Sequence, residues 1–261
     1  MGVKVHKRNL HLVWVLAKTD FLLRYQSSIL GYIWTLLKPL LLFSILYVVF
    51  NSMFRIGADS GEYYSLRLIL GIMVFMFFSD ATGAMLKIFL TKKALVQKIP
   101  LPGWIYILSS MLHSSMIFGL NLLVIAVFFL FQHYVPSLQA IAFFLLYCIL
   151  LAIIMIAFGF LTAGIYVRFR DLAMIWEVIL RALFYATPII YPLSFLPEIY
   201  QKVALIGNPL AFIVHYMNSA LLEDVYPAAW QLSVFSAAAF IALILCIVVY
   251  RKMSTRVAEF I

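Results

Sequence analysis

The stretch RYQSSILGYIWTLLKPLLLFSILYVVFNSMF, residues Arg24 to Phe54, runs from a basic and aromatic segment directly into an apolar one. No charged residue occurs from Leu40 to Phe54, and extension back to Leu36 gives about 19 residues, interrupted only by Lys38 near one end. A helix needs roughly 20 apolar residues to cross about 30 Å of hydrocarbon, and a lysine near the end of a span can extend its amine to the interface. The stretch therefore predicts the point at which the chain enters a membrane.

The composition extends this prediction to the whole chain. Of the 261 residues, 66% are apolar and 11% are charged, and the mean hydropathy is +1.08, which leaves too little polar surface for a water-soluble globule. We predict an all-α polytopic membrane protein with six transmembrane helices, at Leu36–Phe54, Leu66–Phe89, Trp104–Phe131, Leu138–Tyr166, Leu172–Ile190 and Trp230–Tyr250. These spans leave no room for a separate soluble domain, so residues 1–261 are expected to form a single transmembrane domain.

Lysine and arginine are distributed unequally between the two sides of this arrangement. If the amino terminus is cytoplasmic, the cytoplasmic side carries all but four of the 19 Lys and Arg residues; the four are Arg55, Arg67, Lys202 and, within a span, Arg181. Cytoplasmic loops are enriched in these residues, so both termini are predicted to be cytoplasmic. The net charge of +9 is then mainly a signal of topology. It favours anionic lipid or an anionic lipid-linked substrate over nucleic acid as a partner.

Residues 1–35 are predicted to form an amphipathic helix at the membrane interface. Lys7, His11 and Lys18 share one stripe of a helix, while Leu12, Leu16 and Leu23 share another. The segment does not read as a cleaved signal peptide, because charges interleave its apolar residues and no small-residue cleavage site follows. A plain anchoring helix is the alternative interpretation.

Motifs of catalysis and metal binding are missing from the sequence. The five histidines have no metal-ligand spacing, and HExxH, GxSxG and paired-aspartate motifs do not occur. No GxxxxGK[ST] phosphate loop occurs either, so any nucleotide hydrolysis that powers the protein is expected to come from another chain. Cys148 and Cys246 both fall within spans and imply no disulfide framework.

Three ionisable residues, Asp80, Glu177 and Arg181, lie within predicted spans. Such residues are costly in hydrocarbon and point either to function or to one another. Counted at about 1.5 Å per residue, all three lie at comparable depth from the cytoplasmic side. We expect Arg181 to pair with Glu177 one turn earlier on its own helix, or with Asp80 across helices. A structural pair is favoured over direct contact with a substrate.

Two predicted cytoplasmic loops and one interrupted region are candidates for function. The loop TKKALVQKIPLPGW, Thr91 to Trp104, allows one or two helical turns before its two prolines, and VRFRD, Val167 to Asp171, forms a tight basic turn. Residues 191–229 are apolar but interrupted by prolines, so no continuous helix can run through them. Short re-entrant helices fit this pattern, with an ordinary external loop as the alternative.

Four motif pieces in order along these six spans resemble the membrane subunit of ABC-2 type polysaccharide exporters, which move lipid-linked O-antigen, teichoic acid or capsular polymers. The pieces are RYQSSILGYIWTLLKP (24–39), LVQKIPLP (95–102), YVRFRDL (166–172), and ATPIIYP with GNPL (186–192 and 207–210). Each piece alone is of moderate specificity, but their order and spacing over nearly the full length make the combination specific.

The resemblance implies a homodimer in the bacterial inner (cytoplasmic) membrane, joined to two ATPase subunits that bind ATP and Mg, with no cofactor in this chain and a polyprenyl-pyrophosphate-linked polysaccharide as the substrate. It implies an ATPase-coupling helix in the second cytoplasmic loop, with contacts from Lys92, Lys93, Leu95, Val96, Lys98 and Pro100. Contacts with the carrier head group at the entrance are expected from Arg24, Tyr25, Trp34 and Lys38. Residues 191–229 would form the outer gate region before the last span, 230–250, with channel or gate contacts from Tyr185, Pro188, Tyr191 and Pro192.

Two functions of other classes remain as alternatives. An intramembrane enzyme acting on polyprenyl phosphates would need a cluster of acids or metal ligands on a cytoplasmic loop, where Asp171 is the only acid. A secondary transporter would be expected to show inverted repeats or two matched broken helices, and only one broken region is apparent. The absence of these features favours the exporter, with O-antigen as the first choice of polymer and teichoic acid as the second.

Overall fold

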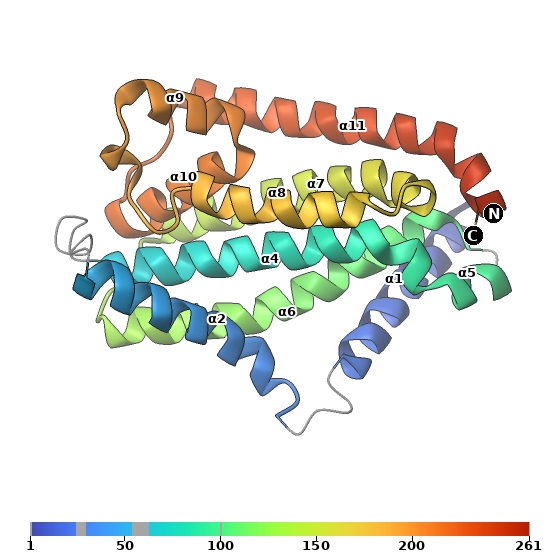
Figure 1. Cartoon of the computed structure of the whole chain (residues 1–261), viewed down its shortest axis with the longest axis horizontal. Helices are drawn as coiled ribbons and strands as arrows, with labels where there is room; N and C mark the ends of the chain where they lie inside the picture. The colour runs from blue at the N-terminus through green and yellow to red at the C-terminus, as the bar shows by residue number, and fades with distance from the viewer. Residues whose placement is uncertain (1, 25–29, 54–62, 100, 261) are drawn as a thin grey trace.

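The computed structural model describes residues 2–24, 30–53, 63–99 and 101–260, and every regular element in this part of the chain is helical. The elements are α1 (Gly2–Leu23), α2 (Ile33–Tyr47) with its π-helical continuation η1 (Val48–Met53), α4 (Tyr64–Thr91), α5 (Lys93–Lys98), α6 (Gly103–Phe131), α7 (Leu138–Arg168), α8 (Leu172–Ala186), η2 (Leu193–Phe195), α9 (Glu198–Gly207), α10 (Pro209–Glu223) and α11 (Ala229–Phe260). Figure 1 shows the long helices side by side, with α5, the start of α1 and the end of α11 gathered at one end of the bundle and α9 at the other.

The predicted spans are confirmed in part. Among the described residues, five helices are long and apolar enough to cross a membrane: Ile33–Asn51, Tyr64–Thr91, Gly103–Phe131, Leu138–Arg168 and Ala229–Met253. A sixth is reached only if α9 and α10, which meet at a bend of 109°, are counted as one span. The chain is therefore a multi-pass membrane protein with five or six apolar crossings.

The predicted fifth span, Leu172–Ile190, is wrong in its length. Helix α8 ends at Ala186 after 15 residues, about 22 Å, because Thr187 precedes Pro188 and takes an extended conformation. Such a helix is shorter than the hydrocarbon core. In Figure 1 it runs beside α4 and leads into the segment that carries η2 and α9. The predicted interruption after this helix is confirmed, since the helices that follow are short.

Helix α4 forms the centre of the bundle. Its most apolar window is 72% buried, and α2, α6, α7, α8 and α10 all contact it. A close helix approach lies at Gly159 of α7, where an added Cβ would stand 2.8 Å from Met85 Sδ and 3.1 Å from Ile107 Cγ2. Glycine at this point lets three backbones pack together, as small residues do in membrane bundles.

Helix α1 packs against α6 through Val13 and Ala17, which are both buried. Of the residues in the two predicted stripes, Leu12 and Leu16 are half-buried, Leu23 is 57% exposed, and His11 and Lys18 are exposed. Lys7 lies outside the described side chains, and the position of α1 at a membrane interface stays a prediction.

The residues directly before α2 contact the last turn of α1. The Tyr32 ring stacks on Phe21 with centroids 5.0 Å apart, and its hydroxyl donates to the Phe21 carbonyl at 3.1 Å. Gly31, directly before, has a φ of 48°, a left-handed conformation that glycine adopts without strain. These contacts fix the start of α2 next to the last turn of α1.

An ion pair joins the last turn of α1 to the junction of α4 and α5. Lys92 Nζ lies 2.5 Å from Asp20 Oδ2, and the two side chains are only 13% and 28% exposed. Lys92 itself follows the last residue of α4 and precedes the first residue of α5. Helix α5 ends at Lys98 because Ile99, which precedes a proline, is extended. The α1 helix is thus attached directly to the base of the α5 loop.

Helix α10 is held to the rest of the bundle at both of its ends. Asn208 caps its start by accepting from the Leu210 N–H at 3.0 Å, and it donates to Thr187 Oγ1 at 3.0 Å. At the other end of α10, Glu223 forms an ion pair with Arg67 of α4. The Tyr64 hydroxyl donates to the Ile190 carbonyl at 3.0 Å, which anchors the segment before α9 to α4 as well.

The approach of α7 to α4 and α6 predicts the effect of an added side chain. Gly159→Val places two methyl groups where Met85 and Ile107 already stand, and overpacking of this kind costs about 1–3 kcal/mol. We expect a lower melting temperature of the detergent-solubilised chain, measured by size-exclusion chromatography after heating. Gly119→Val on α6 is the control, because a Cβ at Gly119 meets nothing within 4 Å. Equal losses for both variants would contradict the packing argument.

The Asp20–Lys92 pair predicts a rescue by charge exchange. Asp20→Lys or Lys92→Asp alone sets like charges together in a half-buried place and should lower stability by about 1–2 kcal/mol, between the values for exposed and buried pairs. The double exchange should restore most of the loss in the same heating assay. Lys87→Asp, an exposed position on α4, controls for the change of charge alone. A double variant no more stable than the singles would show that the pair contributes no attraction.

Candidate functional site

Three adjoining cavities share one side chain, that of Asp80 on α4. A narrow cavity of about 30 Å³ lies between α2, α4 and α6, an α1 cavity of about 460 Å³ lies between α1, α4 and α6, and an α8 cavity of about 390 Å³ lies between α2, α4 and α8. Arg24 lines the narrow and α1 cavities, whereas Lys38 lines the narrow and α8 cavities. Asp80 therefore lies where the cavities lined by Arg24 meet the cavities lined by Lys38.

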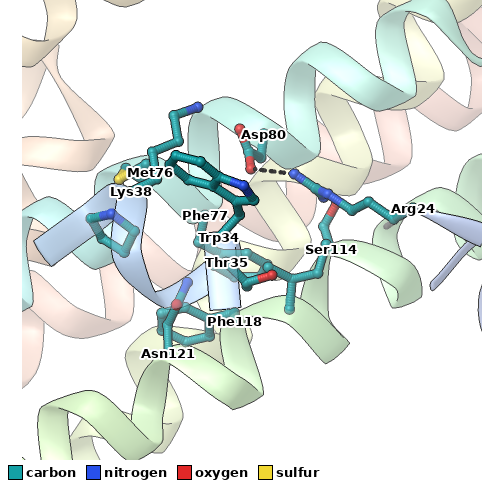
Figure 2. A pocket seen from close by; sticks show the side chains of 12 residues that line it. Arg24, Trp34, Thr35, Lys38, Met76, Phe77, Asp80, Ser114, Phe118 and Asn121 are labelled. Carbon is teal, nitrogen blue, oxygen red and sulfur yellow. Dashed lines mark hydrogen bonds and ion pairs between the residues drawn. The ribbon is translucent and has the colours of Figure 1, made fainter. Parts of the chain in front are cut away.

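The narrow cavity gathers side chains of several chemical kinds. Figure 2 shows Arg24, Asp80 and Lys38 around the indole of Trp34, with Phe118 and Asn121 farther down the cavity. Arg24 comes directly after α1, Trp34 and Lys38 come from the first turns of α2, and Asp80 comes from α4. Asp80 is 11 residues before the end of α4, about 16 Å along the helix from the α5 loop. The site thus lies nearer to the α5 end of the bundle than to the other end.

Arg24 is held by two partners. Its Nη2 lies 3.2 Å from Asp80 Oδ2, and its Nη1 lies 3.4 Å from His113 Nε2 of α6. The side chains of Arg24 and Asp80 are 32% and 37% exposed, so the pair is partly open to its surroundings. The guanidinium is thus positioned by α4 and α6 together, with part of its surface turned to a cavity.

Two buried polar atoms at the narrow cavity have unused hydrogen-bonding capacity. Thr35 Oγ1 and Asn121 Oδ1 have no hydrogen-bond partner among the described residues, although both side chains belong to residues that are only 6% exposed. Both residues line the cavity, whose volume accommodates about one water molecule. Since unpaired buried polar groups are costly, the cavity is suited to a polar occupant.

The α8 cavity contains the other predicted charges. Arg181 Nη2 lies 2.8 Å from Glu177 Oε1 one turn earlier on α8, which confirms the predicted pair within one helix. The alternative pair of Arg181 with Asp80 is wrong, because Asp80 pairs with Arg24, although Asp80, Glu177 and Arg181 all line this cavity. Glu177 and Arg181 are 64% and 75% exposed in the single chain. The charged face of α8 is therefore uncovered in the single chain.

The structure brings together most of the residues predicted for the substrate entrance. Arg24, Trp34 and Lys38 share the narrow cavity, while Tyr25 lies outside the described residues. Tyr185 joins Lys38 at the α8 cavity and is 66% exposed.

The remaining residues predicted for the gate lie away from these cavities. The Tyr191 hydroxyl donates to the Tyr185 carbonyl at 2.9 Å, and Pro188 and Pro192 are buried in the segment that follows α8. Their surroundings are those of packing residues in this conformation.

The second predicted loop forms a short helix as expected. Lys93 and Lys98 on α5 are exposed, whereas Leu95 and Val96 pack against the core. Lys92 is turned inward to Asp20, and Pro100 lies outside the described residues. The outer face of α5 is therefore basic, and its inner face is apolar and packs against the core.

Several residues of the site were not predicted from the sequence. Asp20, His113, Thr35 and Asn121 carry no motif, but Asp20 has one detectable signal, since it is the only acid among the first 58 residues. An isolated acid at the end of a basic helix indicates a specific partner, four residues before Arg24 and on the same face. Thr35 and Asn121 acquire their places only through the packing of α2 on α6, and His113 acquires its place through the packing of α1 on α6.

The chemistry available at the site is recognition rather than bond making. Two cations, an indole, hydroxyl groups and an amide suit the binding of an anionic group attached to a larger polar molecule. In the described part of the chain, no group of three or more His, Cys, Asp or Glu residues is arranged to hold a metal ion.

The sequence is similar to those of known membrane transport proteins. The sequence profile of the ABC-2 type transporter family matches residues 11–222. Two proteins of Klebsiella pneumoniae, each named O-antigen export system permease protein RfbA, are 25% and 26% identical to the chain over 248 and 253 residues, covering 95% of this chain and 94% of each relative. A protein of the same name from Myxococcus xanthus is 25% identical over 229 residues, covering 87% of this chain and 86% of the relative.

The profile match extends from within α1 to the last turn of α10, and it includes every helix that lines the three cavities. The resemblance drawn from the four motif pieces is confirmed by it. The chain belongs to the ABC-2 type transporter family and is a membrane permease of that family.

Proposed function

We propose that the chain is the membrane subunit of an exporter that moves a lipid-linked polysaccharide, with O-antigen as the first choice and teichoic acid as the second, across the bacterial cytoplasmic membrane. The observation that carries the proposal is the match to permeases of O-antigen export systems over almost the whole length of this chain and of each relative. ATP hydrolysis resides in a separate ATPase subunit, since this sequence has no phosphate loop.

The arrangement of the basic residues supports a cytoplasmic position for both ends of the chain. Helix α5, the start of α1, the turn between α7 and α8, and the end of α11 lie at one end of the bundle in Figure 1. These segments carry most of the Lys and Arg residues. The exposed basic face of α5 then points to the cytoplasm, where an ATPase subunit would dock, and the Asp20–Lys92 pair connects this docking loop to α1.

The narrow cavity and its neighbours are the entrance for the carrier head group in this proposal. Arg24 and Lys38 supply the positive charge that a diphosphate requires, and Trp34 supplies a face on which a sugar can stack. A polyprenyl chain beside α2 and η1 would remain in lipid, because Leu41 and Ile45 of α2 and Val48 of η1 are exposed. The amphipathic α1 would lie along the interface next to this entrance.

The exposed face of α8 supports a homodimer with the pathway between the two copies. Among its described residues α8 has no buried side chain, and its outward Glu177 and Arg181 would be costly against lipid. A second copy, or a water-filled path between two copies, removes that cost. Aromatic residues beside this face, Phe184 and Tyr185, are suited to contacts with sugar rings.

The bent pair α9 and α10 is the outer gate in this proposal. A 109° bend between two apolar helices is the geometry of a re-entrant segment. Helix α10 is packed into the core, whereas α9 has no buried side chain. Helix α9 can therefore move without repacking the core, which suits an element that must open.

The dependence on an ATPase is tested by purifying the tagged chain from its native membrane in mild detergent. We expect an ATPase subunit with a phosphate loop to co-purify, with ATP hydrolysis that is lost when residues 91–102 are scrambled. The scrambled chain must still accumulate in the membrane, and scrambling of residues 224–228, at the opposite end of the bundle, should leave the ATPase attached. Recovery of the chain alone under several detergents would contradict the exporter and favour an intramembrane enzyme or a secondary transporter.

The head-group site is tested with the chain and its ATPase subunit in lipid nanodiscs, using farnesyl diphosphate as the probe and farnesol as its uncharged counterpart. Arg24→Gln and Lys38→Gln should each weaken binding of the diphosphate by about tenfold or more, since hydrogen bonds to charged groups contribute about 1.5–3 kcal/mol. Lys18→Gln, an exposed position on α1 outside the cavities, should leave the affinity unchanged. Calorimetric titration supplies the dissociation constants.

Two results of the titration would contradict the head-group site. Equal affinity for farnesol and farnesyl diphosphate would mean that only the lipid chain is recognised. A loss of affinity with Lys18→Gln as large as that with Arg24→Gln would mean that the diphosphate responds to the general charge of the cytoplasmic face.

A further inference from the structure

The cation best placed to bind the head group already has an anionic partner. Arg24 Nη2 is 3.2 Å from Asp80 Oδ2, and the pair is about two-thirds shielded from its surroundings. A diphosphate that engages Arg24 through the same nitrogen must take the place of the Asp80 carboxylate. The inference below rests on the head-group site of the proposed function and concerns how that site is regulated.

Asp80 lines each of the cavities in which an anion could contact Arg24 or Lys38. Arg24 lines the narrow and α1 cavities, Lys38 lines the narrow and α8 cavities, and Asp80 lines all three. An anion bound by Arg24 and Lys38 together therefore lies beside the Asp80 carboxylate. Near a protein surface, two like charges a few ångströms apart repel each other strongly enough to change an affinity severalfold. Asp80 opposes binding at the same place where the cations favour it.

The cavity is otherwise prepared for a polar occupant. Thr35 Oγ1 and Asn121 Oδ1 are buried, line the narrow cavity and have no hydrogen-bond partner among the described residues. Figure 2 shows Asp80 and Arg24 joined across the side of the cavity that faces Trp34. A hydroxyl or water that accompanies the head group can satisfy the two orphan atoms. Among the described residues that line the cavity, the Asp80 carboxylate is the negatively charged group that resists an anion.

We propose that the Asp80 carboxylate is an internal competitor, which competes with the anionic head group for Arg24. In the empty site Asp80 pairs with Arg24, and a diphosphate that binds displaces Asp80 from this pair. Competition of this kind has a benefit for a transporter. When the head group leaves, Arg24 regains a partner at once, so release does not leave an unpaired charge in a partly buried place. Asp80 thereby lowers the affinity of the site and speeds the exchange of one substrate for the next.

The proposal predicts a gain of affinity when the charge of Asp80 is removed. Asp80→Asn should tighten the binding of farnesyl diphosphate by about tenfold, in the same nanodiscs and with the ATPase subunit present. Asp80→Glu, which keeps the charge, should stay near the wild-type affinity. If the asparagine variant fails to accumulate, Asp80→Ser removes the same charge from a smaller side chain and permits the same comparison.

Two further measurements separate competition from a general effect of charge. Glu177→Gln removes a negative charge from the α8 cavity, where its partner is Arg181, and should change the affinity much less than Asp80→Asn. In an Arg24→Gln background the gain from Asp80→Asn should largely disappear, since Asp80 then has no Arg24 to occupy. An equal gain from Glu177→Gln, or a full gain in the Arg24→Gln background, would overturn the proposal.

Export kinetics supply a readout that a merely structural role would not move. In proteoliposomes, Asp80→Asn should lower the KM for the lipid-linked substrate and also lower kcat, because a tighter site releases its occupant more slowly. A loss of kcat with an unchanged or higher KM would overturn the competitor role and indicate a structural defect.

The titrations also distinguish a failure of the head-group site from a failure of the competitor role of Asp80. If Arg24→Gln binds farnesyl diphosphate as well as the wild type does, both the head-group site and the competitor role are wrong. If Arg24→Gln loses binding while neither Asp80→Asn nor Asp80→Ser gains it, the head-group site stands and the competitor role alone is overturned.

Discussion

The packing of five helices onto α4 is the constraint on which the rest of the structure depends. Helix α4 has no distinct polar face, and its most apolar window is 72% buried. Helices α2, α6, α7, α8 and α10 surround it. Two charged side chains of α4 find partners among its neighbours: Arg67, near the start of α4, pairs with Glu223 of α10, and Asp80, just past the midpoint, pairs with Arg24. Lys92, directly after α4, pairs with Asp20 of α1.

Much of this arrangement could be predicted from the sequence, because long apolar blocks bounded by Lys and Arg residues allow only a helical bundle that crosses a membrane. The α5 helix and its end before Pro100 follow from local rules of proline chemistry, and so does the interruption after α8. The length of α8 was overestimated because Ile189 and Ile190 are apolar, and composition alone does not register that Pro188 stops the helix. Apolar residues after a helix can be buried by other contacts, as Ile189 and Ile190 are.

The candidate site was predicted less completely than the fold. Arg24, Trp34 and Lys38 were grouped through the resemblance to polysaccharide exporters, and the cavity brings them together. Of the two partners considered for Arg181, Asp80 was the wrong one, since depth along a span says nothing about which neighbour a side chain faces. Thr35 and Asn121 could not have been found, because a single hydroxyl or amide in an apolar helix acquires meaning only from the helix packed against it.

The last turn of α1 connects two regions that would otherwise be independent. Asp20 pairs with Lys92 at the base of the α5 loop, and Arg24, one turn later, pairs with Asp80 at the cavities. Residues four apart on a helix share a face and keep a fixed separation, so a displacement of α5 that moves Asp20 also moves Arg24 relative to Asp80. Because the Arg24–Asp80 pair is partly open and the Asp20–Lys92 pair is better shielded, the cavity pair is the one that yields first. A force applied to α5 would therefore change the strength of the Arg24–Asp80 ion pair. The strength of this pair sets the affinity of the proposed site.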